Sequence, residues 1–292
     1  VLPKLAWHLE EPRVGQSYPN YYVAQLASKF VKVVLSGTGG DEIFGGYPWR
    51  YYRTAVNESF EDYIDKYYVY WQRLINNRDL KKVFTPIWND VSHISTRDIF
   101  RDVFLKDKGV IETPEDYINH SLYFEAKTFM HGLLVVEDKL SKAHSLESRV
   151  PFIDNHLVDF AMSCPVSLKL NNLADVVRIN ENQPGSKQSK YVQKSRDGKQ
   201  ILRDAMKHYL PENISQAEKQ GFSAPDASWF KGESIEFVKR TLMSDDARIY
   251  EFMERGPVEA LLKEHLTGKQ NKRLFIWSLL NFEQYLKEIA YG

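Results

Sequence analysis

One short segment constrains the fold more than any other: an apolar run that ends directly in a glycine-rich turn. Val31–Leu35 (VKVVL) is β-branched and apolar, as a buried strand would be, and SGTGGDE follows at once over residues 36–42. The preceding residues 21–30 (YYVAQLASKF) have the apolar spacing of a helix. A helix, a buried strand and a glycine turn in this order predict one unit of a parallel α/β sheet.

The remainder of the chain is predicted to be largely helical. Thr113 and Pro114 suit an N-cap and a first helical position, and a helical pattern runs from there, with interruptions, towards Ser145. The expected buried positions of that pattern are Leu122, Ala126, Phe129, Leu133 and Leu140. Further helices are expected over residues 60–76, 199–209, 257–266 and 272–289, and loops over residues 171–198 and 215–228.

The predicted fold class is therefore α/β and strongly helix-dominated, with parallel strands and a helical C-terminal part. The strand and the glycine turn fall in residues 1–56, and residues 57–292 form the helical part. One strand is too few for a complete α/β domain, so further strands are expected upstream of Val1. In the helix predicted over residues 199–209, the inward positions are Ile201, Leu202, Ala205, Met206 and Tyr209.

Charge, hydropathy and cysteine content exclude several classes of protein. The 292 residues contain 39 Lys+Arg and 39 Asp+Glu, so the chain lacks the positive charge of a non-specific nucleic-acid binder. No apolar run approaches the roughly 18 residues of a membrane helix. The single cysteine, Cys164, excludes an internal disulfide and a multi-cysteine zinc site, and favours a reducing compartment such as the cytoplasm. The 39 aromatic residues (17 Tyr, 16 Phe and 6 Trp) predict thick helix packing or a ring-lined cleft.

The glycine turn is the first candidate site. Ligands of parallel α/β sheets bind at the carboxyl ends of the strands, where this turn lies, and its glycines let backbone N–H groups approach an anion closely. Asp41 and Glu42 suit Mg²⁺, which proteins hold by one or two carboxylates together with phosphate oxygens. A Mg-nucleotide site is one interpretation; a plain turn, whose acids only favour the dipole of a following helix, fits equally well. The dinucleotide-binding, P-loop and serine-hydrolase patterns are absent.

A second candidate is the run EDKLSKAHSLESRVPFID over residues 137–154, which is dense in charges of both signs. A structural ion-pair network is the commoner explanation of such a run. Arg149 and Asp154 are its expected structural members.

Basic residues supply two further candidates. Lys199, Arg203 and Lys207 recur every four residues and form either a solvated stripe or a phosphate-binding face. Lys219 lies in AEKQGFS, and is either an ordinary loop lysine or one that closes over a substrate and neutralises developing charge.

Taken in order, these segments resemble the synthetase domain of glutamine-dependent asparagine synthetases. The similar text is VVLSGTGGDEIFGGYPWRYYR from residue 33, VEDKLSKAHSLESRVPFIDNHLVDFAM from residue 136, GKQILRDAMKHYLPENI from residue 198, and EKQGFSAP from residue 218, followed by Trp229 and Phe230. The resemblance extends from about Leu2 to the last helix, and four motifs in the right order are far more specific than the glycine turn by itself.

The resemblance implies an ATP-pyrophosphatase fold, in which helices enclose a parallel sheet, and a ligase activity. Such enzymes activate the side-chain carboxylate of aspartate as a β-aspartyl adenylate with release of pyrophosphate, and ammonia from glutamine then displaces AMP. By this likeness ATP and Mg²⁺ are the cofactors, Asp41 is a catalytic residue that binds the Mg²⁺, and Lys219 is the catalytic lysine. The residues that would contact the nucleotide and its phosphates are Ser36, Gly37, Thr38, Gly39, Gly40, Glu42 and Lys199.

Two departures from the family pattern bear on function. The pyrophosphatase loop S-G-G-x-D-S and the N-terminal cysteine of the glutaminase are absent, so the chain is expected to be the C-terminal portion of a longer protein and inactive by itself. Thr38 stands where well-studied asparagine synthetases carry a Glu thought to handle the acceptor chemistry.

Alternatives therefore stay open at this point. One is a related adenylating amidotransferase, such as a β-lactam synthetase or a peptide-modifying enzyme, and another is a non-catalytic helical binding fragment. The partners expected from the resemblance are a glutaminase domain, aspartate, ATP and ammonia, without nucleic acid or membrane, and a homodimer is left open.

Overall fold

Two short parallel strands form the sheet in the computed structural model, which describes residues 1–292 except 53, 56, 105–110, 172–196, 218–232 and 291–292. β1 (Val33–Leu35) pairs with β2 (Glu147–Arg149), and Val34 lies opposite Ser148. The predicted strand is confirmed in a shorter form. The prediction of a single strand is wrong, because β2 consists of three polar or charged residues (ESR) and no apolar run marks it.

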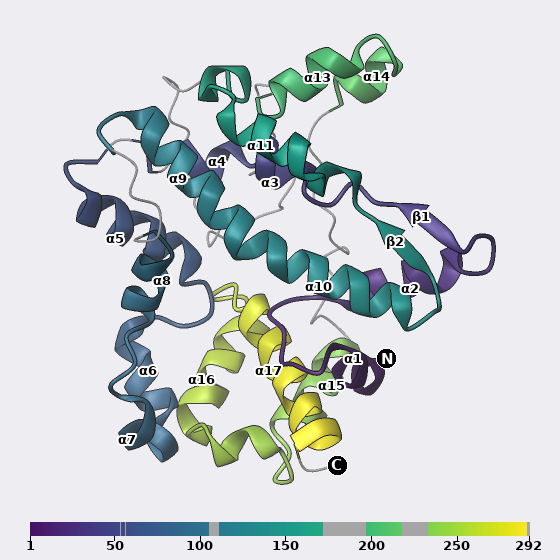
Figure 1. The fold of residues 1–292 in the computed structure, drawn as a ribbon. Helices are drawn as coiled ribbons and strands as arrows, with labels where there is room; N and C mark the ends of the chain where they lie inside the picture. Colours follow the sequence, from purple (N-terminus) through teal and green to yellow (C-terminus); the bar gives the residue numbers. More distant parts are fainter. Residues whose placement is uncertain (53, 56, 105–110, 172–196, 218–232, 291–292) are drawn as a thin grey trace.

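Helices make up most of the remaining described chain, as Figure 1 shows. Before β2 these are α1 (Leu2–Leu9), α2 (Tyr18–Ala27), α3 (Gly40–Phe44), α4 (Pro48–Tyr52), α5 (Phe60–Trp71), α6 (Asn77–Val83), α7 (Trp88–Val91), α8 (Thr96–Phe104), α9 (Pro114–Lys127) and α10 (Phe129–Lys142). After β2 follow α11 (Asn155–Ser163), α13 (Gln200–Met206), α14 (Glu212–Ser215), α15 (Glu233–Leu242), α16 (Arg255–Leu266) and α17 (Arg273–Tyr285). Single 3₁₀ turns span Thr85–Ile87, Pro151–Ile153, Val166–Leu168 and Arg248–Glu251, and a π turn spans Leu286–Ala290.

The helix pair α9 and α10 crosses the molecule and supports the sheet (Figure 1). The predicted N-cap at Thr113 is confirmed: its hydroxyl accepts from Asp116 N at 3.3 Å, and the Asp116 carboxylate accepts from Thr113 N at 2.8 Å. The helix breaks at Thr128, whose hydroxyl donates to Phe124 O at 2.7 Å. α10 then runs alongside α2 and β2. Of the predicted buried positions, Leu122 and Leu140 are completely buried, and the other three are partly exposed.

Aromatic side chains fill the space between α5, α8 and α9. Rings of this cluster lie 4.6–6.5 Å apart, mostly in edge or tilted contacts, of which Phe100 and Phe124 at 4.6 Å are the tightest. A separate apolar core joins α15, α16 and α17 around Trp277. The high aromatic content therefore serves helix packing. Among the described residues, no helix combines the length and the apolar character that crossing a bilayer requires.

Several helix boundaries differ from those predicted. The helix predicted over residues 60–76 ends at Trp71, and the one predicted over residues 199–209 covers only Gln200–Met206. Tyr209 was expected to face inward but is 79% exposed, and Ala205 is exposed as well. The physical reason is that Ile201 and Leu202 pack in the cluster formed with α3 and α11, whereas α13 ends at Met206, so the helical spacing does not extend to Tyr209. The loops predicted over residues 171–198 and 215–228 lie mostly outside the described residues.

Candidate functional site

The glycine turn leaves the sheet at the end of β1 and enters α3. Gly39 has a φ of 97°, and a Cβ added there would lie 2.1 Å from Ile153 Cδ1, so a glycine is required at this position. A Cβ added at Gly40 would lie 3.3 Å from the Phe152 ring. Gly37 is exposed, and an added Cβ would meet no atom within 4 Å. The turn is therefore packed against the protein at Gly39 and Gly40 and open to a ligand at Gly37.

Asp41, on the first turn of α3, forms an ion pair with Lys199. Lys199 Nζ lies 2.9 Å from Asp41 Oδ1, and the two side chains are 26% and 20% exposed. Gly46 lies directly against the Asp41 carboxylate: a Cβ added to this glycine would lie 2.0 Å from Asp41 Oδ1. The fold thus brings together an acid and a lysine that the sequence had placed in separate motifs. A partly exposed carboxylate beside an ammonium, at the end of a strand, can hold both a metal ion and phosphate oxygens.

Lys199 reaches Asp41 through a strained turn. Its own φ is 56°, and Gly198 before it has a φ of 93°. A Cβ at Gly198 would lie 2.6 Å from Gly45 O, so only glycine lets the two turns approach. Lys199 N donates to Phe44 O at 3.0 Å, which ties the turn to the end of α3. Backbone in this region costs about 1–3 kcal/mol for a non-glycine residue and persists only where the surroundings hold it.

Thr38 lies in a cluster of hydroxyls around Glu137. The Thr38 hydroxyl donates to Glu137 Oε2, and the Ser148 hydroxyl donates to Oε1. Ser36 Oγ lies 3.0 Å from Thr38 Oγ1 and accepts from Thr38 N at 3.2 Å. The sequence had placed Glu137 in a charged run and given it no role. The pairing of β1 with β2 and the position of α10 bring it to the turn, and no local pattern signals that meeting.

Glu42 faces away from the open side of the turn. Its side chain is buried, and a carboxylate oxygen accepts from the Tyr47 hydroxyl at 3.0 Å. Burial raises the pKa of Glu42 above its ordinary value. The two adjacent acids therefore differ: Asp41 is partly exposed and pairs with Lys199, whereas Glu42 lies in the interior.

Near Glu42, Arg50 and Glu125 form a buried ion pair with an N–O distance of 3.3 Å. The guanidinium carbon of Arg50 lies 3.8 Å from the centre of the Tyr47 ring and 4.6 Å from that of Phe129. Tyr67 donates its hydroxyl to Glu125 at 3.2 Å. Burial raises the pKa of Glu125, and the nearby Arg50 opposes that shift. This network fixes α4 and α9 beneath the turn.

The charged run over residues 137–154 does not form one network among the described residues. Arg149 lies 3.6 Å from Glu147 in an exposed pair. Asp154 caps α11, where its carboxylate accepts from His156 N at 3.0 Å and Leu157 N at 3.2 Å. Arg149 and Asp154 are structural, as expected, but through a surface pair and a helix cap.

The three basic residues at positions 199, 203 and 207 do not form one stripe in the structure. Lys207 pairs with Asp204 at 2.5 Å on the surface of α13, and Arg203 turns back to donate to backbone carbonyls, including Gly198 O at 3.1 Å. Of the three basic residues, Lys199 is the one that lies against Asp41. Lys219, the predicted catalytic lysine, lies outside the described residues.

The residues at the turn fit a Mg²⁺ ion that is coordinated mostly by the phosphate oxygens of a bound ligand. The described chain contains no group of three or more His, Cys, Asp or Glu side chains that could hold a metal ion by themselves. Asp41 offers one partly exposed carboxylate at the start of α3, and Mg²⁺ commonly uses one or two carboxylates together with substrate phosphates.

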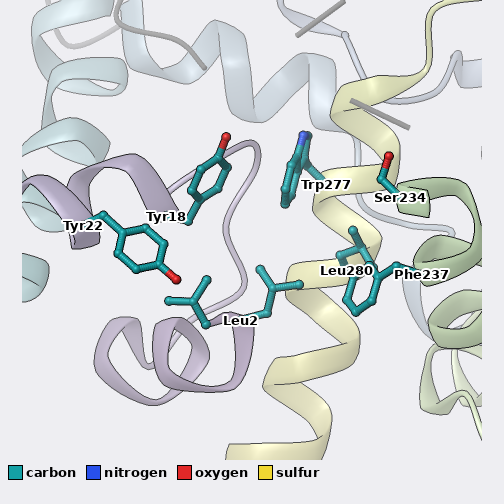
Figure 2. Close-up of a pocket in the computed structure, with 8 residues that line it drawn as sticks. Leu2, Tyr18, Tyr22, Ser234, Phe237, Trp277 and Leu280 are labelled. Carbon is teal, nitrogen blue, oxygen red and sulfur yellow. The ribbon is translucent and has the colours of Figure 1, made fainter. Parts of the chain in front are cut away.

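A shallow apolar pocket of about 280 Å³ lies away from the turn, between α1, α2, α15 and α17 (Figure 2). Leu2, Tyr18, Phe237 and Trp277 line it. The described residues of its lining include no Asp, Glu, Lys, Arg or His side chain.

Comparison with known proteins identifies the class. The family model described as asparagine synthase matches residues 1–287. Asparagine synthetase (glutamine-hydrolyzing) 1 of Bacillus subtilis is 28% identical over 314 aligned positions, which cover 96% of this chain and 44% of that protein. Asparagine synthetase (glutamine-hydrolyzing) 3 of the same organism is 26% identical, over 97% of this chain and 42% of that protein. The amidase chyE of Penicillium rubens is 26% identical over 147 positions, covering 50% of this chain and 19% of that protein.

The chain belongs to the asparagine synthase family. The predicted fold class is confirmed: the structure is helix-dominated with parallel strands, and this family has the adenine nucleotide alpha hydrolase-like fold. The chain spans about 44% of the length of the first of these relatives, which therefore have an additional portion.

Proposed function

We propose that this chain carries part of the phosphate site of an ATP-dependent, amide-forming ligase. The observation that supports this most directly is the ion pair between Asp41 and Lys199 at the start of α3, the helix that follows β1 and the glycine turn. Asp41 would hold Mg²⁺, which when bound neutralises charge on the phosphates, and Lys199 would place an ammonium beside the same oxygens. Ser36 and the backbone of Gly37 would line the nucleotide.

The proposed reaction is the conversion of aspartate to asparagine. A side-chain carboxylate oxygen of aspartate attacks the α-phosphorus of ATP, and the bond to pyrophosphate breaks. Ammonia then attacks the acyl carbon of the β-aspartyl adenylate, loses a proton, and expels AMP, which takes the electron pair of the broken C–O bond. Negative charge develops on phosphate oxygens in the first step, and this is the charge that the Asp41 site and Lys199 would stabilise.

Thr38 and Glu137 favour a second candidate within the same class, in which the carboxylate or the acceptor differs. Thr38 takes the place of a family glutamate, and its hydroxyl donates to Glu137, so a carboxylate from α10 lies at this position instead. The presence of an amidase among the relatives fits such variation. In this candidate the adenylation step is unchanged and Glu137 faces the acceptor.

The nitrogen donor and the partner portion are proposals that follow from the relatives. Their names specify glutamine hydrolysis, and they extend well beyond the region matched here. We infer that glutamine supplies the ammonia through a glutaminase portion of the same protein, and that the residues described here do not form the whole active site.

The experiment that tests the function is the carboxylate-dependent exchange of labelled pyrophosphate into ATP, catalysed by the intact protein. Exchange that requires aspartate supports the asparagine synthetase reaction. Exchange that requires a different carboxylate supports the second candidate. Absence of exchange with every carboxylate, together with absence of Mg-ATP binding, would indicate a binding fragment and contradict the proposal.

A further inference from the structure

The turn that carries Lys199 is anchored by a buried carboxylate, Asp197. Asp197 is 3% exposed. Its Oδ1 accepts from Asn171 N at 2.6 Å and from Gly198 N at 3.0 Å, and its Oδ2 accepts from the Tyr52 hydroxyl. Tyr52 is buried at the end of α4, which follows the Gly45–Gly46 turn behind Asp41. Asp197 thus joins the Lys199 turn to the same helix whose entry turn supports Asp41.

Arg203 also stabilises this turn, by hydrogen bonds to backbone carbonyls. Its Nε donates to Gly198 O at 3.1 Å, and its Nη1 donates to Ser215 O and Ala217 O at 3.0 Å each. Ala217 is the last described residue before the segment that contains Lys219. One guanidinium therefore connects the backbone beside Lys199 to the chain that leads towards the predicted catalytic lysine.

The backbone needs such support because two consecutive residues have positive φ. Glycine adopts this conformation readily, but Lys199 keeps it only when fixed contacts outweigh the cost. The contacts on both sides of the pair use charge-assisted hydrogen bonds, which are stronger and shorter than neutral ones, and Asp197 itself is buried. A surface lysine that only interacts with solvent would gain nothing from this arrangement.

We propose that Asp197 is a positioning residue that holds the Lys199 ammonium against Asp41, with Arg203 as the brace of the same turn. The inference rests on the proposed function, in which Lys199 serves the phosphates, and extends it to residues that do not face the ligand. It predicts that Asp197 acts through Lys199 and not on the ligand directly.

The test measures the reactivity of the Lys199 amine by trace acetylation of the intact protein, read for each lysine by mass spectrometry. Asp197→Ala should raise the rate at Lys199 by roughly two- to five-fold, the factor that corresponds to loss of a partly exposed ion pair. The rate at the completely buried Lys169 should stay unchanged, which shows that the fold is intact. Asp197→Asn, which keeps an acceptor oxygen, should restore most of the protection. Asp204→Ala, which removes an exposed carboxylate of α13, should leave Lys199 unchanged.

A double-variant comparison separates positioning from a general structural role. In an Asp41→Asn background, Asp197→Ala should have no further effect on Lys199, because the contact that it preserves is already lost. An unchanged Lys199 rate in Asp197→Ala, an equal increase in both backgrounds, or a parallel increase at Lys169 would overturn the proposal. Because acetylation needs no nucleotide, protection by Asp197 in a protein that binds no Mg-ATP would support the positioning role while contradicting the proposed function.

Discussion

The ammonium of Lys199 lies 2.9 Å from Asp41 Oδ1, and each of the two residues is placed by a glycine turn. Gly46 leaves room for the Asp41 carboxylate, and Gly198 lets the Lys199 turn approach Gly45 O. Two motifs that are remote in sequence thus meet because neither turn carries a side chain at the point of contact. The result is a carboxylate and an ammonium paired at the start of α3.

The glycines of the first turn should differ in their tolerance of alanine. Gly39→Ala should lower the free energy of unfolding by about 1–3 kcal/mol, because its φ of 97° is unfavourable for alanine and Ile153 must move. Gly37→Ala is the matched control and should change stability by less than about 0.5 kcal/mol, since its added methyl meets no neighbour. Denaturant unfolding of both variants measures this. Equal stability of the two would show that the turn is not packed as described.

Glu137 should affect amide formation more than nucleotide binding. Glu137→Gln replaces the carboxylate that accepts from Thr38 and Ser148, so we expect the rate of amide formation to fall on the order of 10- to 100-fold. The dissociation constant of Mg-ATP should stay within about two-fold. Glu147→Gln removes an exposed carboxylate of β2 and serves as the control. A Glu137→Gln variant that loses Mg-ATP binding and amide formation equally would place Glu137 at the nucleotide instead.

Glu42 should make the protein less stable as the pH rises. Burial raises the pKa of Glu42 in the folded state above its unfolded value, so between these two values the folded state binds more protons. The free energy of unfolding therefore decreases as the pH rises through this window and is higher on its acid side. Glu42→Gln should reduce that slope. Part of the slope should remain in this variant, because the pKa of Glu125 is also raised in the folded state.

Unfolding by denaturant at a series of pH values measures the effect. Glu115→Gln, which changes an exposed carboxyl on α9, is the matched control variant. A slope that is the same with and without Glu42 would mean that this carboxyl is not desolvated by folding.

The sequence predicts those features that are determined by residues close together in the chain, and misses those that depend on tertiary contacts. The β1 segment and the Thr113 cap are marked by neighbouring residues, and both are found where predicted. β2 has no apolar run, and its strand conformation comes from pairing with β1 through contacts such as Ser36 N to Arg149 O at 2.8 Å. The exposure of Tyr209 likewise depends on where α13 ends, because the helix stops at Met206 and the spacing that placed Tyr209 inward does not continue.

The candidate site shows the same limit. The glycine turn, Asp41 and Lys199 could be selected by residue type and family resemblance. Glu137 could not, because its contacts with Thr38 and Ser148 require the sheet register and the packing of α10. The inward orientation of Glu42 is also a tertiary property, since an acid adjacent to Asp41 is equally able to face solvent when only the sequence is considered.

The central claim is that Asp41 and Lys199 form a Mg-phosphate site, and calorimetric titration of the intact protein with Mg-ATP and Mg-pyrophosphate tests it most directly. We predict binding that Asp41→Asn weakens by at least about ten-fold, because a charge-assisted contact is worth on the order of 1.5–3 kcal/mol. Asp204→Asn, a change of an exposed carboxylate on α13, should bind as the unaltered protein does. Binding that is equally tight in the Asp41→Asn variant, or absent from the unaltered protein, would contradict the claim.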